Sequence, residues 1–338
     1  MTWRFFPIER FADHAGAWRD LNARSANSPL LDPLFVAPSI EAFRRGGELL
    51  GLFGDVNRPA AMGIFQPAKR FSWQTFQPAN APLGAWLSET DKPLVDFLAP
   101  LVASIPGPAL LLGLTQLDPD FHPRSAPGAR LRTADYIETA RITVEGSFED
   151  YWQLRSKNLR HNTKRQTNRL KRDNVTVRFE ILSAPEDMGR AVADYSALEQ
   201  SGWKADIDTA VRAEDAQGRF YEAMLKGFGA LGQAAVYRYF YDDTLVASDI
   251  CIERDGCMIV LKTAHDHSQK NTSPAQLMRY KIFRRAFESG KIQRIEFYGP
   301  VMDWHTRWTE EVRTIYHVNY YRWPWLAALH GRRAPSKI

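Results

Sequence analysis

Apolar and other residues alternate along Leu245–Glu253, and a second strand-like stretch, Cys257–Ala264, follows shortly after it. A period of two is typical of β-strands that bury one face. The dipeptide Asp255-Gly256 stands between the two stretches and favours the tight turn of a β-hairpin. The pattern therefore predicts two antiparallel strands joined by a two-residue turn.

The segment after this hairpin predicts a loop that opens onto a helix. The polar run His265–Thr272 leads to Ser273-Pro274, which is typical of a helix N-cap followed by proline at the first helical position. The helix is expected over Ala275–Ser289, and the apolar run Ile292–Phe297 predicts a short buried strand. A strand that leads through a loop to an exposed helix N-terminus is suited to bind a phosphate group. The segment therefore points to a phosphorylated cofactor.

The rest of the chain shows helical and strand-like patterns that divide it into two similar halves. The first half predicts helices at His14–Ala23, Ser39–Arg45 and Lys92–Ala103 and strands at Leu49–Phe53, Ala60–Phe65, Phe71–Phe76, Ala109–Leu114 and across Leu131–Val144. The second half adds helices at Phe148–Leu154, Lys157–Arg172, Pro185–Gln200 and Ala216–Gly227 and strands at Thr176–Ile181 and Gln233–Tyr241. A chain of 338 residues exceeds what one hydrophobic core usually organises. We expect a duplicated α+β unit, with domains at 1–145 and 146–338.

Composition narrows the class of protein only slightly. The 44 Lys+Arg residues outnumber the 39 Asp+Glu residues, and the resulting net charge of +5 permits an anionic ligand without requiring nucleic acid. The N-terminus lacks the apolar core of a signal peptide, and the most apolar region, Phe97–Leu114, is interrupted by prolines. We therefore expect a cytoplasmic protein with no integral membrane segment.

The register of the predicted hairpin places Asp249 directly opposite Lys262. This pair is either a cross-strand ion pair or a partly buried carboxylate whose pKa is tuned for general base catalysis. The same register puts Cys251 and Cys257 on opposite faces of the sheet, where they are unable to form a disulfide.

Three groups of side chains are candidates for binding. The loop residues Lys270 and Asn271, with the backbone N–H groups of the following helix, are suited to hold a pyrophosphate, although an ordinary capped helix has the same pattern. Trp203-Lys204 and Trp304-His305 are placed either to line a substrate cleft or to anchor the core. His265 and His267 lack further ligands at suitable spacing, so no metal site is expected.

The predicted helix Lys157–Arg172 is strongly basic. Leu159, Thr163, Gln166 and Leu170 fall on one narrow stripe, and lysine and arginine cover most of the remaining surface. Such a face is able to contact the phosphates of tRNA, a nucleotide-linked sugar or an anionic lipid, and it is equally compatible with a solvated helix.

Several short motifs follow one another over Phe148–Trp308. They are Tyr151-Trp152, the run Ser156–Arg165, Glu199 with Gly202-Trp203-Lys204, the run Ser273–Leu277, and Glu296–Pro300 followed by Trp304–Trp308. Their order resembles that of the GNAT-fold acetyltransferases of the cellulose-biosynthesis (CelD-like) family, which are related to the FemAB-type peptidyltransferases. Two positions depart from the family pattern. Ser-Pro-Gly is usual where this chain has Ser273-Pro274-Ala275, and Tyr-Lys is usual where it has Trp304-His305.

The resemblance implies tandem GNAT-like units, each a mixed sheet flanked by helices, and acyl transfer from acetyl-CoA or another acyl-CoA to an amine or hydroxyl. The cofactor would lie between splayed strands, with its pyrophosphate near Lys270, Asn271, Ser273, Ala275 and Gln276. Asp249 or His265 would accept the proton and Tyr298 would protonate the leaving thiolate. Trp203, Lys204, Trp304 and His305 would contact the acceptor.

The acceptor class that the resemblance implies is a glycan, an amino sugar or a peptide precursor. Two alternatives stay open. In one, the protein is an aminoacyl-tRNA-dependent FemAB-like transferase, with tRNA bound by the basic helix 157–172. In the other, it is a catalytically silent scaffold in exopolysaccharide assembly, as the altered positions Ala275 and His305 would allow.

Overall fold

The computed structural model describes residues 2–69, 71–200, 211–269 and 271–331. The chain divides into unit 1, formed by Met1–Glu138 and Arg313–Ile338, and unit 2, formed by Thr139–Val312. The predicted boundary at 145/146 lies close to the first division, but the chain after residue 312 was assigned to the second domain and belongs to the first. The reason is strand β13 (Val312–Tyr321), which pairs antiparallel with β6 (Leu111–Leu117) of unit 1.

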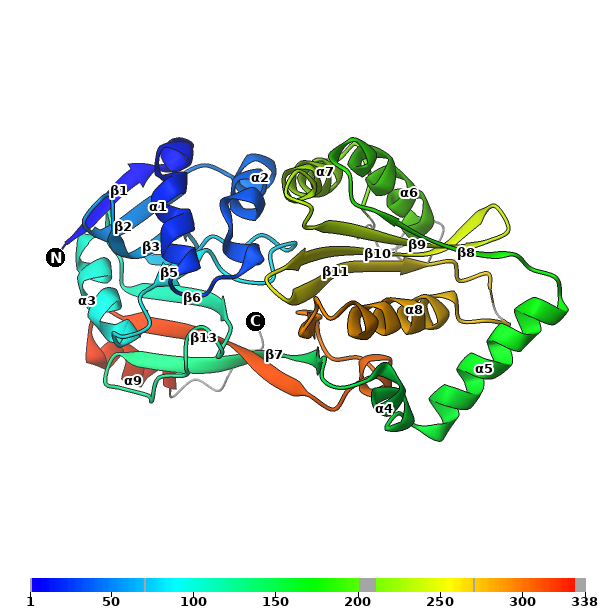
Figure 1. Cartoon of the computed structure of the whole chain (residues 1–338). Helices are drawn as coiled ribbons and strands as arrows, with labels where there is room; N and C mark the ends of the chain where they lie inside the picture. Colours follow the sequence, from blue (N-terminus) through cyan, green and yellow to red (C-terminus); the bar gives the residue numbers. More distant parts are fainter. Residues whose placement is uncertain (1, 70, 201–210, 270, 332–338) are drawn as a thin grey trace. The chain divides into compact units, whose positions relative to one another are not determined.

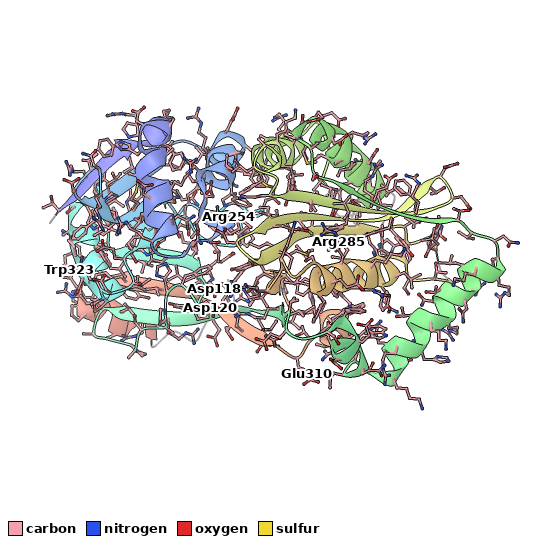
Figure 2. The ribbon with its side chains drawn as sticks, in the orientation of Figure 1. Asp118, Asp120, Arg254, Arg285, Glu310 and Trp323 are labelled. Carbon is pink, nitrogen blue, oxygen red and sulfur yellow. The ribbon has the colours of Figure 1, made fainter. Side chains whose placement is uncertain are left out.

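Unit 1 is a mixed sheet with helices packed against it. Besides β6 and β13, its elements are β1 (Trp3–Pro7), β2 (Leu49–Gly54), β3 (Pro59–Pro67), β4 (Ser72–Thr75), β5 (Trp86–Ser88), α1 (Phe11–Ala23), α2 (Pro33–Phe43), α3 (Leu94–Ser104) and α9 (Pro324–Gly331). The strand order is β1-β2-β3-β4-β6-β13, and β5 pairs with β3. Trp3, Trp86 and Phe97 pack together in its core. Asp118, labelled in Figure 2, accepts a hydrogen bond of 2.7 Å from Arg313 Nη2 in the same unit.

Strand β7 (Leu131–Thr143) leads into unit 2, which is a second mixed sheet. Its other elements are α4 (Phe148–Gln153), α5 (Lys157–Arg172), β8 (Val177–Leu182), α6 (Met188–Gln200), α7 (Ala216–Gly229), β9 (Ala234–Tyr241), β10 (Thr244–Arg254), β11 (Cys257–His265), α8 (Pro274–Ser289) and β12 (Arg294–Glu296). The strand order is β7-β12-β11-β10-β9-β8. Helices α6 and α7 lie on one side of β9–β11 and α8 lies on the other (Figure 1). Both faces of the central strands are therefore covered.

The predicted hairpin and the predicted basic helix are confirmed. Strands β10 and β11 pair antiparallel with Arg254 opposite Cys257, which places the turn at Asp255-Gly256. Both cysteines of the chain are free thiols. Helix α5 begins and ends where it was predicted, and its buried residues are Leu159, Thr163, Gln166 and Leu170.

Helix α8 buries its apolar stripe against the sheet and exposes charged residues on the other side. Phe283, Ala286 and Phe287 are buried, whereas Arg284 and Glu288 are exposed and form an ion pair. Arg285, labelled in Figure 2, donates a hydrogen bond of 3.0 Å to the hydroxyl of Tyr237 on β9. The helix is thus fixed on the sheet along its C-terminal half. In the part of the chain that the structure describes, no helix combines the length and the apolar character needed to cross a membrane.

Candidate functional site

A cavity opens in unit 2 where two parallel strands stop pairing. Strands β11 and β12 pair at three register positions, from Cys257↔Arg294 to Ile259↔Glu296, and β11 then continues to His265 paired with β10 on its other side. The cavity has a volume of about 490 Å³. Its walls come from the end of β11 (Thr263, Ala264, His265), the start of α8 (Ser273, Ala275, Gln276, Arg279), the segment after β12 (Trp304, Arg307, Trp308) and Glu199 of α6.

The predicted pairing of Asp249 with Lys262 is wrong. The register of β10 and β11 shifts between Ile250 and Cys251, because Cys251 faces Val260 while Ile250 faces Lys262. Strand β11 thus carries one extra residue, as in a β-bulge. Asp249 consequently faces Thr263.

The nearest described cation to the carboxylate of Asp249 comes from α8. Arg279 Nε lies 3.7 Å from Asp249 Oδ2, and both side chains are buried. Asp249 Oδ1 has no hydrogen-bond partner among the described residues. Burial raises the pKa of Asp249 to about 6, and the attraction of Arg279 opposes this rise. Asp249 is not among the described residues that line the cavity, so it acts on the cavity through Arg279.

Arg279 is a feature of the site that was not predicted. Its residue is 6% exposed, it lines the cavity, and its Cζ lies 3.7 Å from the ring centroid of Trp304. A signal for it exists in the sequence. Arg279 stands four residues before Phe283, so it occupies the apolar stripe of the helix, where a charged residue is unusual.

Glu199 also reaches the cavity, and donors from Val211 and Tyr195 contact its carboxylate. Its Oε2 accepts a hydrogen bond of 2.8 Å from the backbone N–H of Val211, and its Oε1 accepts one of 3.1 Å from the hydroxyl of Tyr195. Glu199 is only 4% exposed. In the sequence analysis Glu199 belonged to one of the family motifs, but no function was predicted for it. Among the described residues, a buried carboxylate and a buried guanidinium thus both line the cavity.

The two residues of the predicted pair Trp304-His305 have different positions. Trp304 lines the cavity, whereas His305 is not among the described lining residues. The imidazole of His305 stacks on Trp304 with ring centroids 3.5 Å apart, and its Nδ1 accepts a hydrogen bond of 2.9 Å from the N–H of Met302. Burial, with a smaller contribution from Arg279, lowers the pKa of His305 to about 4. The imidazole is therefore neutral near pH 7 and packs against the ring of Trp304.

The start of α8 is joined to the basic helix α5. Ser273 occupies the N-cap position, but its side chain makes no capping hydrogen bond. Its backbone N–H donates instead to Gln166 Oε1 at 3.0 Å, and Gln276 Nε2 donates to Thr163 Oγ1 at 3.0 Å. Both partners belong to the buried stripe of α5. The stripe thus sets the position of the helix N-terminus that was predicted to bind phosphate.

A cationic groove of about 800 Å³ follows α5 beside this N-terminus. Among its lining residues are Lys164, Arg165, Arg169, Arg172 and Asn271, which was predicted to bind the cofactor. The ion pairs described within α5 and its C-cap use Asp173, which pairs with Arg169 and Arg172. The groove is therefore strongly positive.

The other predicted site residues lie partly elsewhere. Tyr298 is buried with a positive φ of 49° and is not among the described residues lining the cavity. His265 lines the cavity with its ring 4.2 Å from that of His267. The described residues contain no group of three side chains suited to hold a metal ion. Lys270, Trp203 and Lys204 lie outside the described residues.

Known proteins share this architecture at low sequence identity. Residues 157–306 match the family model described as an acetyltransferase (GNAT) domain. The C-terminal domain of a proposed lysylphosphatidylglycerol synthetase from Agrobacterium fabrum has a TM-score of 0.57 and 13% identity, over 96% of this chain and 96% of that chain. FemX has a TM-score of 0.56 and 9% identity, over 97% of this chain and 99% of that chain. A conserved protein of unknown function from Bacteroides thetaiotaomicron has a TM-score of 0.55 and 12% identity, over 90% of this chain and 97% of that chain.

A comparison with curated protein sequences finds no significant match. Identities this low show the fold alone, and the narrower CelD-like resemblance stays a prediction. The expected fold class is confirmed. The chain is built from mixed sheets flanked by helices in the tandem GNAT-like arrangement, and residues 157–306 match the GNAT acetyltransferase domain.

Proposed function

We propose that the protein is an acyl-CoA-dependent acyltransferase whose acceptor is a small amine, in free form or as part of a glycan or peptide precursor. The observation that carries this proposal is the cavity at the point where β11 and β12 stop pairing, which reaches Ser273 and Ala275 at the N-terminus of α8. The N–H groups in the first turn of a helix lack partners within the helix and favour an anion. An acyl-CoA whose thioester lies between the strands would thus have its pyrophosphate at this N-terminus.

The groove along α5 supplies charge for the rest of such a ligand. Lys164, Arg165 and Arg169 lie beside the N-terminus of α8, because Gln166 and Thr163 hold the two helices together. An acyl-CoA carries a nucleotide with an additional phosphate, and a row of cations matches this distribution of charge. Ala275 is buried at the same place, so its methyl group belongs to the wall of the cavity.

The transfer needs little covalent help from the protein. The acceptor nitrogen attacks the thioester carbonyl carbon, the C–N bond forms, the C–S bond breaks, and the coenzyme leaves as a thiolate. Holding the two reactants in one cavity accounts for much of the rate enhancement. We assign His265 as the group that accepts the proton of the amine, because it lines the cavity and histidine is the side chain that most often serves as a general base. A role for Tyr298 in protonating the thiolate stays a prediction.

Calorimetric titration with acetyl-CoA and desulfo-CoA tests the proposal. We expect binding to the wild-type protein and a loss of affinity of about tenfold in Gln166→Ala, because this variant removes the hydrogen bond that positions the N-terminus of α8 beside α5. The double variant Lys270→Ala/Ser273→Ala is expected to weaken binding as well. Arg284→Gln, on the exposed side of α8, is the matched control and should bind like the wild type. Absence of heat with both ligands would contradict the proposal.

One observation favours a second candidate, transfer from an aminoacyl-tRNA. The cations of α5 greatly outnumber its acidic neighbours, as in a surface that binds a nucleic-acid backbone. Binding of tRNA would weaken steeply with salt, with a slope that becomes smaller by about one for each phosphate contact removed in Lys164→Ala or Arg165→Ala. Tight binding of CoA together with salt-insensitive, weak binding of tRNA would exclude this candidate.

A further inference from the structure

The guanidinium of Arg279 is buried, and among the described residues its Nε lacks the hydrogen bond that a buried donor normally makes. Arg279 is 6% exposed, and its Nε has no hydrogen-bond partner among the described residues. Buried charges are usually paired and hydrogen-bonded, because transfer from water to the interior is costly. The carboxylate of Asp249 is 3.7 Å from Nε, which is too long for a hydrogen bond. Burial lowers the pKa of Arg279, and the attraction of Asp249 opposes this decrease only in part.

Among the described residues, Arg279 lies against Trp304 and Asp249 and also lines the cavity. Trp304 covers a face of the guanidinium at 3.7 Å and Asp249 lies behind it. The side chain is nevertheless among those that line the cavity of about 490 Å³. A planar guanidinium offers its donors in a fork that fits a carboxylate. An arginine held in this way is ready to bind an anion that enters the cavity.

Glu199 brings the opposite charge to the same cavity. It is 4% exposed, lines the cavity, and is held in place by the N–H of Val211 and the hydroxyl of Tyr195. A ligand with an amine and a carboxylate would match Glu199 and Arg279 together. Trp308, which lines the cavity as well, provides an apolar wall for the ligand.

We propose that Arg279 binds the carboxylate of the acceptor, and that the acceptor is therefore an amino acid, in free form or at the end of a peptide. This inference rests on the proposed acyl transfer and names the acceptor class for it. Arg279 acts as a specificity residue, because it touches the acceptor away from the reacting nitrogen. Glu199 holds the ammonium form of the same molecule until His265 removes the proton.

The test compares each member of a panel of L-amino acids with its own carboxamide. Acetyl-CoA is the donor, and release of the coenzyme thiol is the readout. For the preferred side chain, kcat/KM is expected to be higher for the acid than for the amide by a factor on the order of 10 to 100, the range for a hydrogen bond to a charged group. In Arg279→Gln this preference should disappear, and Arg279→Lys should restore part of it. Arg284→Gln should keep the full preference.

One further variant and one binding measurement separate the possible outcomes. Arg279→Gln leaves the Asp249 carboxylate buried alone, so Asp249→Asn/Arg279→Gln is measured beside it as a neutral pair. Equal rates for acids and amides in the wild type would overturn the inference, and so would an equal loss of both rates in the Arg279 variants. If acetyl-CoA binds by calorimetry but no amino acid is acetylated, the inference is wrong and the proposed function stands. If acetyl-CoA does not bind, both are wrong.

Discussion

Replacement of Asp249 by asparagine is expected to change how the stability of the protein depends on pH. Asp249 is 1% exposed, and burial raises its pKa from 3.8 to about 6 against the opposing effect of Arg279. An acid whose pKa is higher in the folded protein than in the unfolded chain binds its proton more strongly when folded. Ionised Asp249 therefore lowers the free energy of unfolding above pH 6, and this loss is relieved as the pH falls through 6 toward 3.8.

The size of this effect follows from the two pKa values. Their difference of about 2 corresponds to about 3 kcal/mol, of which about 2 kcal/mol should appear between about pH 7.5 and 4.5. Asparagine does not titrate, so the wild type should gain this amount relative to Asp249→Asn as the pH is lowered. Arg279 loses its counter-charge in the variant. That loss shifts the absolute stability of the variant by an amount that is nearly independent of pH in this range, because arginine stays protonated.

Urea unfolding at a series of pH values measures this difference. Far-UV circular dichroism and tryptophan fluorescence should both be followed, since a protein with two units is able to unfold in more than one step. Ser248→Ala is the control, because Ser248 is the buried neighbour of Asp249 and does not ionise. The difference between wild type and Ser248→Ala should not change with pH. A difference between wild type and Asp249→Asn that is equally flat would refute the assignment of Asp249 as a buried, proton-binding carboxylate.

His305 should show the opposite behaviour. Its pKa is lowered by burial from 6.5 to about 4, so the neutral form stabilises the fold above pH 6.5, and up to about 3 kcal/mol is lost relative to His305→Gln as the pH falls toward 4. Urea unfolding of the wild type and His305→Gln checks this, and a wild-type free energy of unfolding that stays constant or rises relative to the variant on acidification would contradict the neutral assignment. In unit 1, Gly84→Ala should destabilise the protein by about 2 kcal/mol. The reason is that the added Cβ would lie 2.3 Å from the carbonyl oxygen of Thr115. Thermal unfolding measures the loss, acetyl-CoA affinity should stay unchanged, and an unaltered Tm would show that the Gly84 loop relaxes.

The elements that could be predicted from the sequence are those whose signals are local. Asp255-Gly256 placed the hairpin and the pairing of Arg254 with Cys257, because the turn and its flanking strands are adjacent in the chain. Helix α5 was predicted with its observed bounds and its observed buried stripe, since Ser156 caps its N-terminus and lysine and arginine fill its other faces. These features depend on a few neighbouring residues and need no information about the rest of the fold.

The errors come from contacts between distant parts of the chain. No strand was predicted after Ile292–Phe297, but Tyr316–Tyr321 of β13 pair with Leu111–Leu117, about two hundred residues earlier. The bulge at Leu261 has no signature in the sequence. Because of it, the residue opposite Asp249 is Thr263 and not the predicted Lys262. A shift of one residue changes the face on which every later side chain lies. The partner of Asp249 could therefore not be found from the hairpin alone.

The bulge and Arg279 together indicate why this part of the fold has its composition. The pair Arg279–Asp249 is a weak source of stability. The two groups are 3.7 Å apart, and Arg279 Nε and Asp249 Oδ1 have no hydrogen-bond partner among the described residues, so the pair recovers little of the desolvation cost of its two charges. Apolar residues of similar volume at both positions would serve the core at least as well. The arrangement does place a cation against the ring of Trp304 in the wall of the cavity. Local rules of folding are most often broken at functional sites, where a ligand supplies the missing partner. The charge on the apolar stripe of α8 is thus better explained by the acceptor that it binds than by the fold that it destabilises.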